Sequence, residues 1–400
     1  MKIKRIAYIA NARLPTEKAH GYQICKMCEA FAQNGVNVIL LHPERHQSNP
    51  ELKRKSVFDY YSLQSIFEVH TLPNWDVVTL NAWIPSKLFT GIFFTHGMLW
   101  GLYAALKAAK TKANLYYTRD ISIAFWLTKL GLPTVYEAHT VPKRVQRWFL
   151  QQLIRNSALQ QIVVLTSFIK KELIEIGFPS EKILVEPDAV DLSLFSDLPS
   201  KETCRQRLEL PQERAIIGYI GRFHTMGKEK GIPELIQAMA QVPLIDGKEP
   251  LLLCVGGPME VVPNYLEIAR RFNIPEHRLK FIDRVPNREV PTWLRTFDIA
   301  VAPFPYSEHY AYFMSPLKIF EYMAAGTPII TSDLPSIGEV LKHGENSWLV
   351  EPGSFTAIAQ GIQHLMRNGQ LRHNLVHQSL KDIQYYTWNA RASRIIKSFE

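Results

Sequence analysis

Lys318 and Glu321 lie three residues apart in the segment SPLKIFEYMAAGTPII, which has the features of a short capped helix. Ser315 is a favourable N-cap residue and Pro316 suits the first helical position. The backbone N–H groups of Leu317 and Lys318 would then have no intrahelical partners. Together with the positive end of the helix dipole and the Lys318 ammonium, these amides could bind a phosphate group.

The same segment also fits an ordinary amphipathic helix. Leu317, Phe320 and Ala324 follow helical spacing toward a core, which places the lysine and the glutamate together on another face. Gly326 can end the helix, and an extended segment follows it. A surface pair between the lysine and the glutamate is therefore an alternative to a phosphate site.

A second basic group follows the predicted strand Ile216–Ile220, in the sequence GYIGRFHTMGKEKG. Arg222 would project from the carboxyl end of this strand, where open parallel sheets bind ligands. Lys230 lies on a glycine-bounded loop, and the two cations could neutralise the charge of a leaving diphosphate. Neither the dinucleotide G-x-G-x-x-G pattern nor the G-x-x-x-x-G-K-[ST] pattern is present, which disfavours a dehydrogenase or a triphosphatase. A solvated basic loop is the alternative.

The length and the apolar pattern indicate two α/β domains. With 400 residues, 46% of them apolar and 21% charged, the chain exceeds one ordinary core. Strands alternate with helical segments throughout, which is typical of parallel sheets. The predicted strands of the first half are Arg5–Ala10, Val36–Leu41, Leu115–Tyr117, Thr134–Tyr136 and Gln161–Leu165. Those of the second half are Ile216–Ile220, Leu251–Val255, Leu279–Ile282, Ile299–Ala302, Ile329–Thr331 and Ser347–Val350. The polar stretch Pro187–Ala215 is the predicted domain boundary.

The net charge of +9 is concentrated in the first 199 residues, which contain 23 basic and 16 acidic residues. Such a bias suits an anionic partner, such as a lipid surface or a phosphorylated substrate, although it could also serve solubility alone. Nucleic acid is disfavoured because no Lys/Arg-rich run or recognition motif appears. The N-terminus lacks a continuous apolar core or cleavage signal, so we interpret it as a first strand and expect a cytoplasmic protein.

Residues 88–106, LFTGIFFTHGMLWGLYAAL, lack acidic and basic side chains other than His96 and approach membrane-spanning length. Three glycines, the histidine and the many aromatic residues argue against a spanning helix. We favour a buried helix of an α/β domain. The alternative is an apolar surface that dips into the inner face of an anionic membrane.

The four cysteines predict neither a disulfide framework nor a metal site. Cys25 and Cys28 form a C-x-x-C pair, but Ile24, Met27, Cys28 and Phe31 have the spacing of a helix face. Because no second Cys/His cluster is spaced for zinc, we expect packed, reduced thiols.

Together these segments resemble a known family. GRFHTMGKEKG is similar to the G-R-x-K-G element of the retaining family-4 glycosyltransferases (glycosyl transferases group 1), and SPLKIFEYMAAGTPII is similar to their glutamate-bearing donor helix. The resemblance extends over nearly the whole chain through PTEKAHGYQICKMCEAFAQNG, VYEAHT, PDAVDLSLF, LLLCVGGP and the region of Trp388. Each motif alone is weak, whereas six in the order of the family are specific.

The resemblance implies an α/β protein of GT-B architecture, with two Rossmann-like domains facing a central cleft. The expected domains are residues 1–195 on the acceptor side and 205–380 on the nucleotide-sugar donor side. Residues 381–400 would form a C-terminal helix that packs back on the first domain. The implied reaction moves a sugar from a nucleoside diphosphate sugar to an acceptor hydroxyl, with retention of the anomeric configuration. We expect no metal or other cofactor, since no Asp-x-Asp pattern is present to bind one.

The resemblance also assigns roles on the donor side. Arg222 and Lys230 would bind the diphosphate, and the amides of Leu317 and Lys318, after Ser315, would complete the phosphate site. Glu321 would accept hydrogen bonds from the ribose hydroxyls, because two vicinal hydroxyl donors suit one carboxylate.

Further residues are assigned at the base, at the first loop and near the transferred sugar. Val285 falls where the family's backbone meets the base, and Gly21 would let a loop approach the phosphates. His139 matches the histidine near the transferred sugar; a histidine bonded only to its own loop is the alternative. Arg119 and Asp120 lie at a strand end facing the cleft, where a surface ion pair would explain them equally well.

One departure from the family concerns the donor sugar. The family's usual motif has a glutamate eight residues before the position of Glu321, and this chain has Phe313 there. Glu308 or His309 could substitute for that acid as sugar contacts.

Two alternative functions remain at this point. One is a nucleotide-sugar epimerase or a phosphorylase of the same fold. The other, which Phe313 suggests, is a catalytically silent subunit that binds a nucleotide or a partner. The acceptor of a transferase would be a glycan, a lipid-linked compound or a small molecule.

Overall fold

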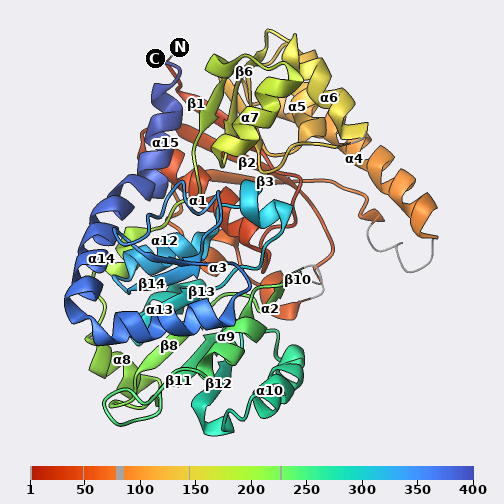
Figure 1. Ribbon diagram of the computed structural model, residues 1–400. Helices are drawn as coiled ribbons and strands as arrows, with labels where there is room; N and C mark the ends of the chain where they lie inside the picture. The colour runs from red at the N-terminus through yellow and green to blue at the C-terminus, as the bar shows by residue number, and fades with distance from the viewer. Residues whose placement is uncertain (1, 48, 78–84, 144, 226–227) are drawn as a thin grey trace. The chain divides into compact units, whose positions relative to one another are not determined.

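The computed structural model describes all residues except 1, 48, 78–84, 144 and 226–227, and divides the chain into two compact units (Figure 1). Unit 1 comprises Met1–Pro187 and Trp388–Glu400, and unit 2 comprises Asp188–Thr387. Each unit is an α/β layer structure around one main sheet.

Unit 1 contains a seven-stranded sheet in the order β3-β2-β1-β4-β5-β6-β7, with parallel pairing throughout. Its strands are β1 Arg5–Ile9, β2 Asn37–Pro43, β3 Glu68–Leu72, β4 Leu115–Thr118, β5 Thr134–Ala138, β6 Leu159–Val164 and β7 Ile183–Val185. Its helices are α1 Ala19–Gln33, α2 Pro50–Lys53, α3 Val57–Tyr61, α4 Ser86–Ala109, α5 Ile121–Lys129, α6 Val145–Ile154, α7 Ser167–Ile176 and α15 Trp388–Lys397. The strand order reverses between β1 and β4, and ligands bind at the carboxyl ends of such strands.

Unit 2 contains a six-stranded parallel sheet in the order β12-β11-β8-β13-β14-β15. Its strands are β8 Ile216–Ile220, β11 Leu251–Val255, β12 Leu279–Ile282, β13 Ile299–Ala302, β14 Ile329–Ser332 and β15 Trp348–Val350, and a small ribbon pairs β9 His224–Thr225 with β10 Lys228–Glu229. Its helices are α8 Lys201–Arg207, α9 Ile232–Met239, α10 Val262–Arg271, α11 Val290–Arg295, α12 Leu317–Ala324, α13 Phe355–Arg367 and α14 Gly369–Asp382. Here the order reverses between β8 and β13.

The sheet of unit 2 is buried on both faces. Ile216 and Ile220 of β8 belong to one apolar cluster, together with Phe320 of α12. Ile217 and Tyr219 belong to a second cluster, which includes residues of α9, α10 and α13. Successive residues of a strand point to opposite faces, so the nearly continuous apolar strands are explained by burial on two sides.

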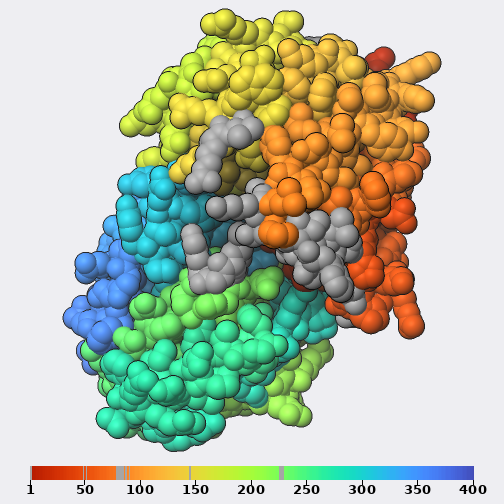
Figure 2. Space-filling view, turned by 90° about the vertical axis from the view of Figure 1, so that its right-hand side faces the viewer, coloured from red at the N-terminus to blue at the C-terminus, as the bar shows by residue number. Residues whose placement is uncertain are grey.

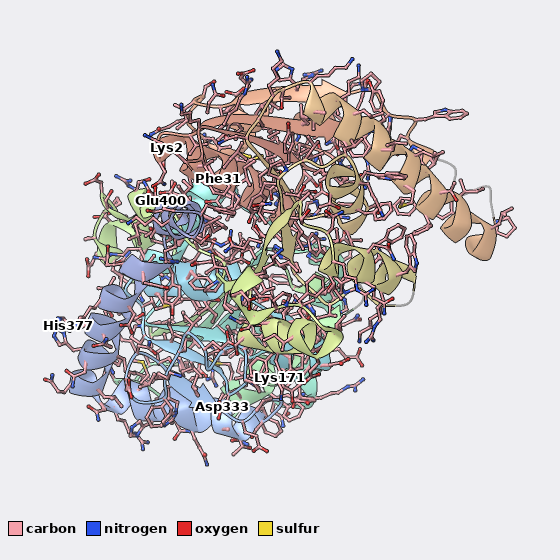
Figure 3. All side chains as sticks on the ribbon, turned by 90° about the horizontal axis from the view of Figure 1, so that it is seen from above. Lys2, Phe31, Lys171, Asp333, His377 and Glu400 are labelled. Atoms are coloured by element: carbon pink, nitrogen blue, oxygen red, sulfur yellow. The ribbon has the colours of Figure 1, made fainter. Side chains whose placement is uncertain are left out.

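The C-terminal helix α15 packs on α1 within unit 1, as expected from the sequence. Figure 3 labels Phe31 of α1 and Glu400 at the end of the chain, and α15 is in contact with α1. The Trp388 ring lies 6.4 Å from the Tyr22 ring, and the Asn34 side chain donates to the Asn389 carbonyl oxygen. The chain therefore returns to its first unit after completing the second.

Helix α4 includes the apolar segment 88–106, and it is only partly buried. Its C-terminal half contributes Trp100, Ala104 and Ala108 to a core shared with α5, whereas Leu88 and Phe93 of the N-terminal half are 60% and 43% exposed. Figure 2 shows this orange segment at the molecular surface. The prediction of a buried helix was therefore wrong for its N-terminal half. Among the described residues, no helix is long and apolar enough to cross a membrane.

All four cysteines are buried and free, as predicted. Burial raises the pKa of the Cys25 and Cys28 thiols well above the ordinary range. Both therefore serve as apolar packing groups on α1.

Candidate functional site

The carboxyl end of β8 leads directly into Gly221 and Arg222. Gly221 has a φ of +127°, and its amide donates to the Val255 carbonyl oxygen. A Cβ atom at Gly221 would lie 3.1 Å from Nζ of Lys318, so the glycine leaves room for the lysine side chain. The Arg222 side chain is exposed, and residues 226–227 of the loop that follows lie outside the described residues.

Lys318 occupies an aromatic environment on the first turn of α12. Its Nζ donates to the Tyr219 hydroxyl oxygen at 2.6 Å and lies 3.8 Å from the centroid of the same ring. The Phe304 ring centroid is 5.3 Å away. Burial, followed by the charge of Lys230, holds the pKa of Lys318 well below its ordinary value, while Glu321 acts in the opposite direction. A bound anion would favour the ammonium form of this lysine.

Lys230 belongs to the same electrostatic cluster. Its Nζ lies 4.5 Å from the centroid of the Tyr310 ring, and its charge acts on Lys318. Gly231 follows it with a φ of +84°, and a Cβ atom there would lie 1.6 Å from the Pro303 carbonyl oxygen. Close contact between the loop and the end of β13 therefore fixes the backbone beside Lys230.

Glu321 supplies a carboxylate to this cluster. Burial raises its pKa to about 7, and the neighbouring Lys318 limits the rise. The structure thus brings Lys230, Lys318 and Glu321 together, near the place where the strand order of the sheet reverses. Two ammonium groups beside one carboxylate suit a ligand with both a diphosphate and hydroxyl groups.

The start of α12 differs from the predicted start by one residue. The helix begins at Leu317, its N-cap is Pro316, and no side chain caps it. The prediction of Ser315 as the capping side chain was wrong, because its Oγ accepts the Asp188 N–H at 2.8 Å instead. The amides of Leu317 and Lys318 still lie at the helix start, where no preceding turn supplies carbonyl acceptors. Gly326 follows the helix with a φ of +61°, as expected for its end.

The remaining residues assigned to unit 2 differ in how deeply they are buried. Val285, two residues after the Asp283 that follows β12, is half-buried and packs against the core of the unit. Glu308 and His309 are exposed at the start of a π-helical turn, His309–Phe313. Phe313 at its end is only 6% exposed, so its ring is part of the buried core.

His139 of unit 1 lies in a hydrogen-bonded group at the carboxyl end of β5. Arg119 Nη2 lies 2.6 Å from its Nδ1, and Glu137 Oε1 lies 2.7 Å from its Nε2. The arginine donates, so Nδ1 accepts and Nε2 carries the proton. Burial, and then the charge of Arg119, lower the pKa of His139 to about 4, so the ring is neutral at pH 7. The histidine is thus bonded beyond its own loop.

Arg119 and Asp120 do not form the surface ion pair that was the alternative for them. Arg119 is directed to His139 and Glu137, and its Nη1 donates to the Gln23 amide oxygen at 3.2 Å. Asp120 is the N-cap of α5, and its carboxylate accepts the Ser122 and Ile123 N–H groups. The two neighbours therefore have separate structural duties.

Gly21 has a packing role that the sequence did not reveal. It lies in the first turn of α1, which begins at Ala19, rather than in a loop. A Cβ atom there would lie 2.2 Å from the Tyr61 hydroxyl oxygen and 2.5 Å from Cγ2 of Thr16. The Tyr61 hydroxyl both accepts from and donates to the Thr16 backbone, so it cannot move aside without losing two hydrogen bonds.

Glu137 and Arg391 were missed as residues that support the site. Glu137 is buried, and burial alone would raise its pKa. Arg391, the hydrogen bond from His139 and the charge of Arg119 instead hold the pKa well below its ordinary value. The only signal in the sequence was the position of Glu137 two residues before His139 in VYEAHT, on the same face of a strand end.

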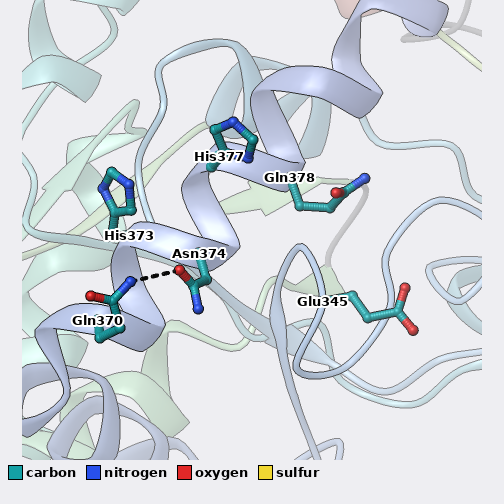
Figure 4. A pocket seen from close by; sticks show the side chains of 6 residues that line it. All are labelled: Glu345, Gln370, His373, Asn374, His377 and Gln378. Atoms are coloured by element: carbon teal, nitrogen blue, oxygen red, sulfur yellow. Dashed lines mark hydrogen bonds between the residues drawn. The ribbon is translucent and has the colours of Figure 1, made fainter.

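A cavity of unit 2 away from this cluster contains none of the predicted site residues. It has a volume of about 560 Å³ and is lined by Glu345, Gln370, His373, Asn374, His377 and Gln378. Figure 4 shows most of these side chains along α14, with the Gln370 amide donating to Asn374 at 2.9 Å. In the described part of the chain, no three His, Cys, Asp or Glu side chains gather as metal ligands would.

Comparison with known proteins agrees with the two-domain organisation. Residues 21–194 match the family model "Glycosyltransferase Family 4", and residues 214–368 match the model "Glycosyl transferases group 1".

Two curated relatives act on inositol compounds, according to their names. A phosphatidyl-myo-inositol mannosyltransferase of Mycobacterium leprae is 27% identical over 213 residues, which cover 53% of this chain and 54% of the relative. A D-inositol 3-phosphate glycosyltransferase of Streptosporangium roseum is 26% identical over 68% of this chain and 65% of its own. The chain thus spans about half to two thirds of the length of these relatives.

Solved structures share the fold over nearly the full length. HepE of Anabaena, in complex with UDP and glucose, has a TM-score of 0.69 at 17% identity, with 99% of both chains covered. Sucrose-phosphate synthase of Thermosynechococcus elongatus has a TM-score of 0.72 at 19% identity, over 99% of this chain and 98% of its own. These likenesses and the two sheets confirm the GT-B-like fold. With both family models matched in order, the chain belongs to the group 1, family-4 glycosyltransferases.

Proposed function

We propose that the protein transfers a sugar from a nucleoside diphosphate sugar to an acceptor hydroxyl, with retention of the anomeric configuration. The observation that carries the proposal is the cluster of Lys230, Lys318 and Glu321 in unit 2. Two cations and a helix start suit a diphosphate, and a carboxylate beside them suits the ribose. Membership of the family supplies the reaction class.

In the proposed reaction, the bond between the anomeric carbon and the diphosphate oxygen breaks, and the acceptor oxygen bonds to the same face of that carbon. Negative charge grows on the departing diphosphate. Lys230 and Lys318 neutralise this charge, with Arg222 as a third cation from the adjacent loop. The acceptor hydroxyl gives its proton to the departing phosphate, so no carboxylate nucleophile is assigned.

The proposed reaction needs no metal, because ammonium groups and helix amides supply the positive charge at the leaving group. Turnover that persists in EDTA supports this part of the proposal. Loss of turnover in EDTA, with recovery on addition of Mg²⁺ or Mn²⁺, contradicts it.

His139 is proposed to contact the transferred sugar as a neutral group. Its Nε2–H and Nδ1 are both engaged by charged neighbours, which fix the orientation of the ring. A neutral, oriented imidazole can exchange one of these hydrogen bonds for a sugar hydroxyl without adding charge near the anomeric carbon. Arg119 and Glu137 would then position it.

A thermal-shift screen of UDP-, GDP- and ADP-sugars tests donor binding, since a ligand well above its Kd stabilises the folded protein. UDP-glucose is the first donor to test, because a structure of the Anabaena neighbour HepE contains it. Transfer with retention from UDP-glucose, an α-linked donor, then predicts an α-glucoside, whose equatorial anomeric proton gives a small H1–H2 coupling by ¹H NMR.

The buried Phe313 favours one competing function, a subunit that binds nucleotide sugars without turning them over. In that case, donors stabilise the protein but neither transfer nor slow donor hydrolysis is measurable. An epimerase would instead convert the sugar of the donor without any acceptor present.

A further inference from the structure

A pocket in unit 1 combines positive charge with polar atoms that have no hydrogen-bond partner among the described residues. Its volume is about 540 Å³, within the range of small-ligand sites. Residues that follow β1, β2 and β3 line it together with α2, so it opens at the carboxyl edge of the sheet. This edge is where parallel α/β sheets bind ligands.

The lining of this pocket is mainly cationic. Arg13, Arg45, Lys53 and Lys55 contribute four positive charges, against the carboxylates of Glu44 and Asp76. Arg13 also pairs with Glu17 at 2.8 Å, outside the lining. A concave surface with excess positive charge concentrates anions, because the field is focused in the low-dielectric hollow.

Arg45 and Asn74, which both line the pocket, each have a buried polar atom without a partner among the described residues. Arg45 Nη2 donates to Asn11 Oδ1, whereas its buried Nε finds no acceptor among the described residues. Asn74 donates to the Glu44 carbonyl oxygen, and its buried Oδ1 likewise has no donor in the described part of the chain. A buried polar group without a partner is costly, so both atoms favour a ligand that completes them.

The two atoms require opposite chemistry. The Arg45 Nε–H needs an acceptor, best an anionic oxygen, and Asn74 Oδ1 needs a donor such as a hydroxyl. A phosphate ester of a polyol supplies both on one small molecule. A bare anion completes only the arginine, and an uncharged sugar leaves the cations unpaired.

The pocket is joined to the candidate reaction centre of unit 1 through Asn11. Asn11 Oδ1 accepts from Arg45 at 2.5 Å, and its Nδ2 donates to Asp120 Oδ2 at 2.9 Å. Asp120 directly follows Arg119, which is bonded to His139. Side-chain hydrogen bonds therefore link the pocket to Asp120, next to Arg119.

We propose that this pocket binds the phosphate group of the acceptor, and that the acceptor is a phosphorylated polyol or sugar. The inference rests on the proposed glycosyl transfer and names the chemical class of its acceptor. Arg45 supplies the specificity for phosphate, with Lys53 adding charge at the rim. The same phosphate could belong to a soluble ester or to the headgroup of a lipid.

Calorimetric titration with glycerol 1-phosphate tests the pocket, with glycerol as the uncharged control. Arg45→Gln is expected to weaken binding about tenfold or more, because a charge-assisted contact is lost. Arg54→Gln makes the same change at an exposed residue next to Lys53 that does not line the pocket, and it should bind as the wild type does. Phosphate that enters the donor site contributes equally to both variants.

Lys53→Gln keeps the test decisive where Arg45→Gln fails to fold, because Lys53 is exposed. Its binding should weaken by about threefold at low ionic strength and recover toward the wild-type value as salt screens the charge. No binding of glycerol 1-phosphate by the wild type, or equal binding by all three variants, overturns the proposal.

Vesicles distinguish the two sources of the phosphate. Sedimentation with phosphatidylglycerol vesicles, but not with phosphatidylcholine vesicles, in a manner that depends on Arg45 assigns the site to a lipid headgroup. Binding of glycerol 1-phosphate without any vesicle binding assigns it to a soluble ester.

Turnover of the donor by the wild-type protein is measured separately. Suppose that no nucleotide sugar is bound or turned over, while Arg45→Gln and Lys53→Gln bind glycerol 1-phosphate more weakly than Arg54→Gln does. The proposed transfer then fails and the phosphate site stands. If donors are turned over and the three variants bind glycerol 1-phosphate equally, the phosphate site alone fails.

Discussion

The guanidinium of Arg391 is fully buried and lies 3.3 Å from the carboxylate of Glu137, a residue 254 positions earlier in the chain. The same carboxylate oxygen is 2.7 Å from His139 Nε2. The returning helix α15 therefore supplies the charge that keeps Glu137 ionised and His139 correctly bonded. This contact helps to hold α15 on unit 1.

Removal of Arg391 should destabilise the protein strongly. Arg391→Met leaves Glu137 buried with fewer partners, and such a loss costs about 3–5 kcal/mol. Chemical denaturation measures the change. Lys397→Met, at an exposed position of the same helix, should change stability by less than about 0.5 kcal/mol. Equal stability of the two variants would show that the buried ion pair does not anchor α15.

His139 should make stability depend on pH. Its pKa of about 4 in the folded protein lies below its ordinary value, so the fold favours the neutral ring. The neutral ring contributes up to about 3 kcal/mol to the free energy of unfolding above about pH 6.5, and this stabilisation is lost as the pH falls toward 4. Unfolding free energies at pH 7.5, 5.5 and 4 should therefore fall less steeply for His139→Gln than for the wild type. His70→Gln, at an exposed position of β3, should follow the wild type; identical slopes for all three proteins would contradict the neutral assignment.

Glu321 should make the affinity for the donor depend on pH near neutrality. Its pKa of about 7 is raised, so its carboxylate form increases between pH 6 and 8. Ribose hydroxyls donate to the carboxylate, and the Kd of the nucleotide sugar should fall about tenfold over this range. In calorimetry, Glu321→Gln should bind the donor more weakly than the wild type, and its Kd should change less with pH. Some binding should persist, because Lys230 and Lys318 remain. An unchanged profile would remove Glu321 from the donor site.

Gly231 should tolerate no side chain. Alanine there would meet the Pro303 carbonyl oxygen and adopt a φ of +84°, whereas Gly247 has a similar φ of +73° and open space around it. Gly231→Ala should cost more than about 2 kcal/mol and weaken donor binding through Lys230, while Gly247→Ala should cost about 1 kcal/mol. If Gly231→Ala and Gly247→Ala lose equal stability in thermal or chemical unfolding, the positive φ alone, and not the contact with the end of β13, restricts Gly231.

The buried strands of both sheets were predictable from their apolar runs. Two strands of the main sheets were missed for physical reasons: β3 is an edge strand with charged, exposed residues, and β7 has only three residues. The two-residue strands β9 and β10 of the small ribbon were missed as well. Lys230, Lys318 and Glu321 around α12 were also predictable, because helical spacing and family motifs can be recognised within short segments of sequence.

Contacts between distant segments were not predictable in the same way. Ser315 was assigned as a helix cap, but its hydroxyl binds the amide of Asp188, 127 residues away. Arg119 and Asp120 are adjacent in sequence, yet they bond to different elements of unit 1. The pocket around Arg45 combines segments after three strands, each of which has an ordinary polar composition.

The turnover of a nucleotide sugar by Lys230→Ala tests the central claim most directly. The wild type should consume at least one donor of the UDP, GDP and ADP series, and Lys230→Ala should consume it about 100-fold more slowly, the usual effect of removing one charge that stabilises a leaving group. Lys381→Ala, at an exposed position of α14, should match the wild type. Turnover of Lys230→Ala equal to that of Lys381→Ala, or donor binding by the wild type without any turnover, would contradict the account.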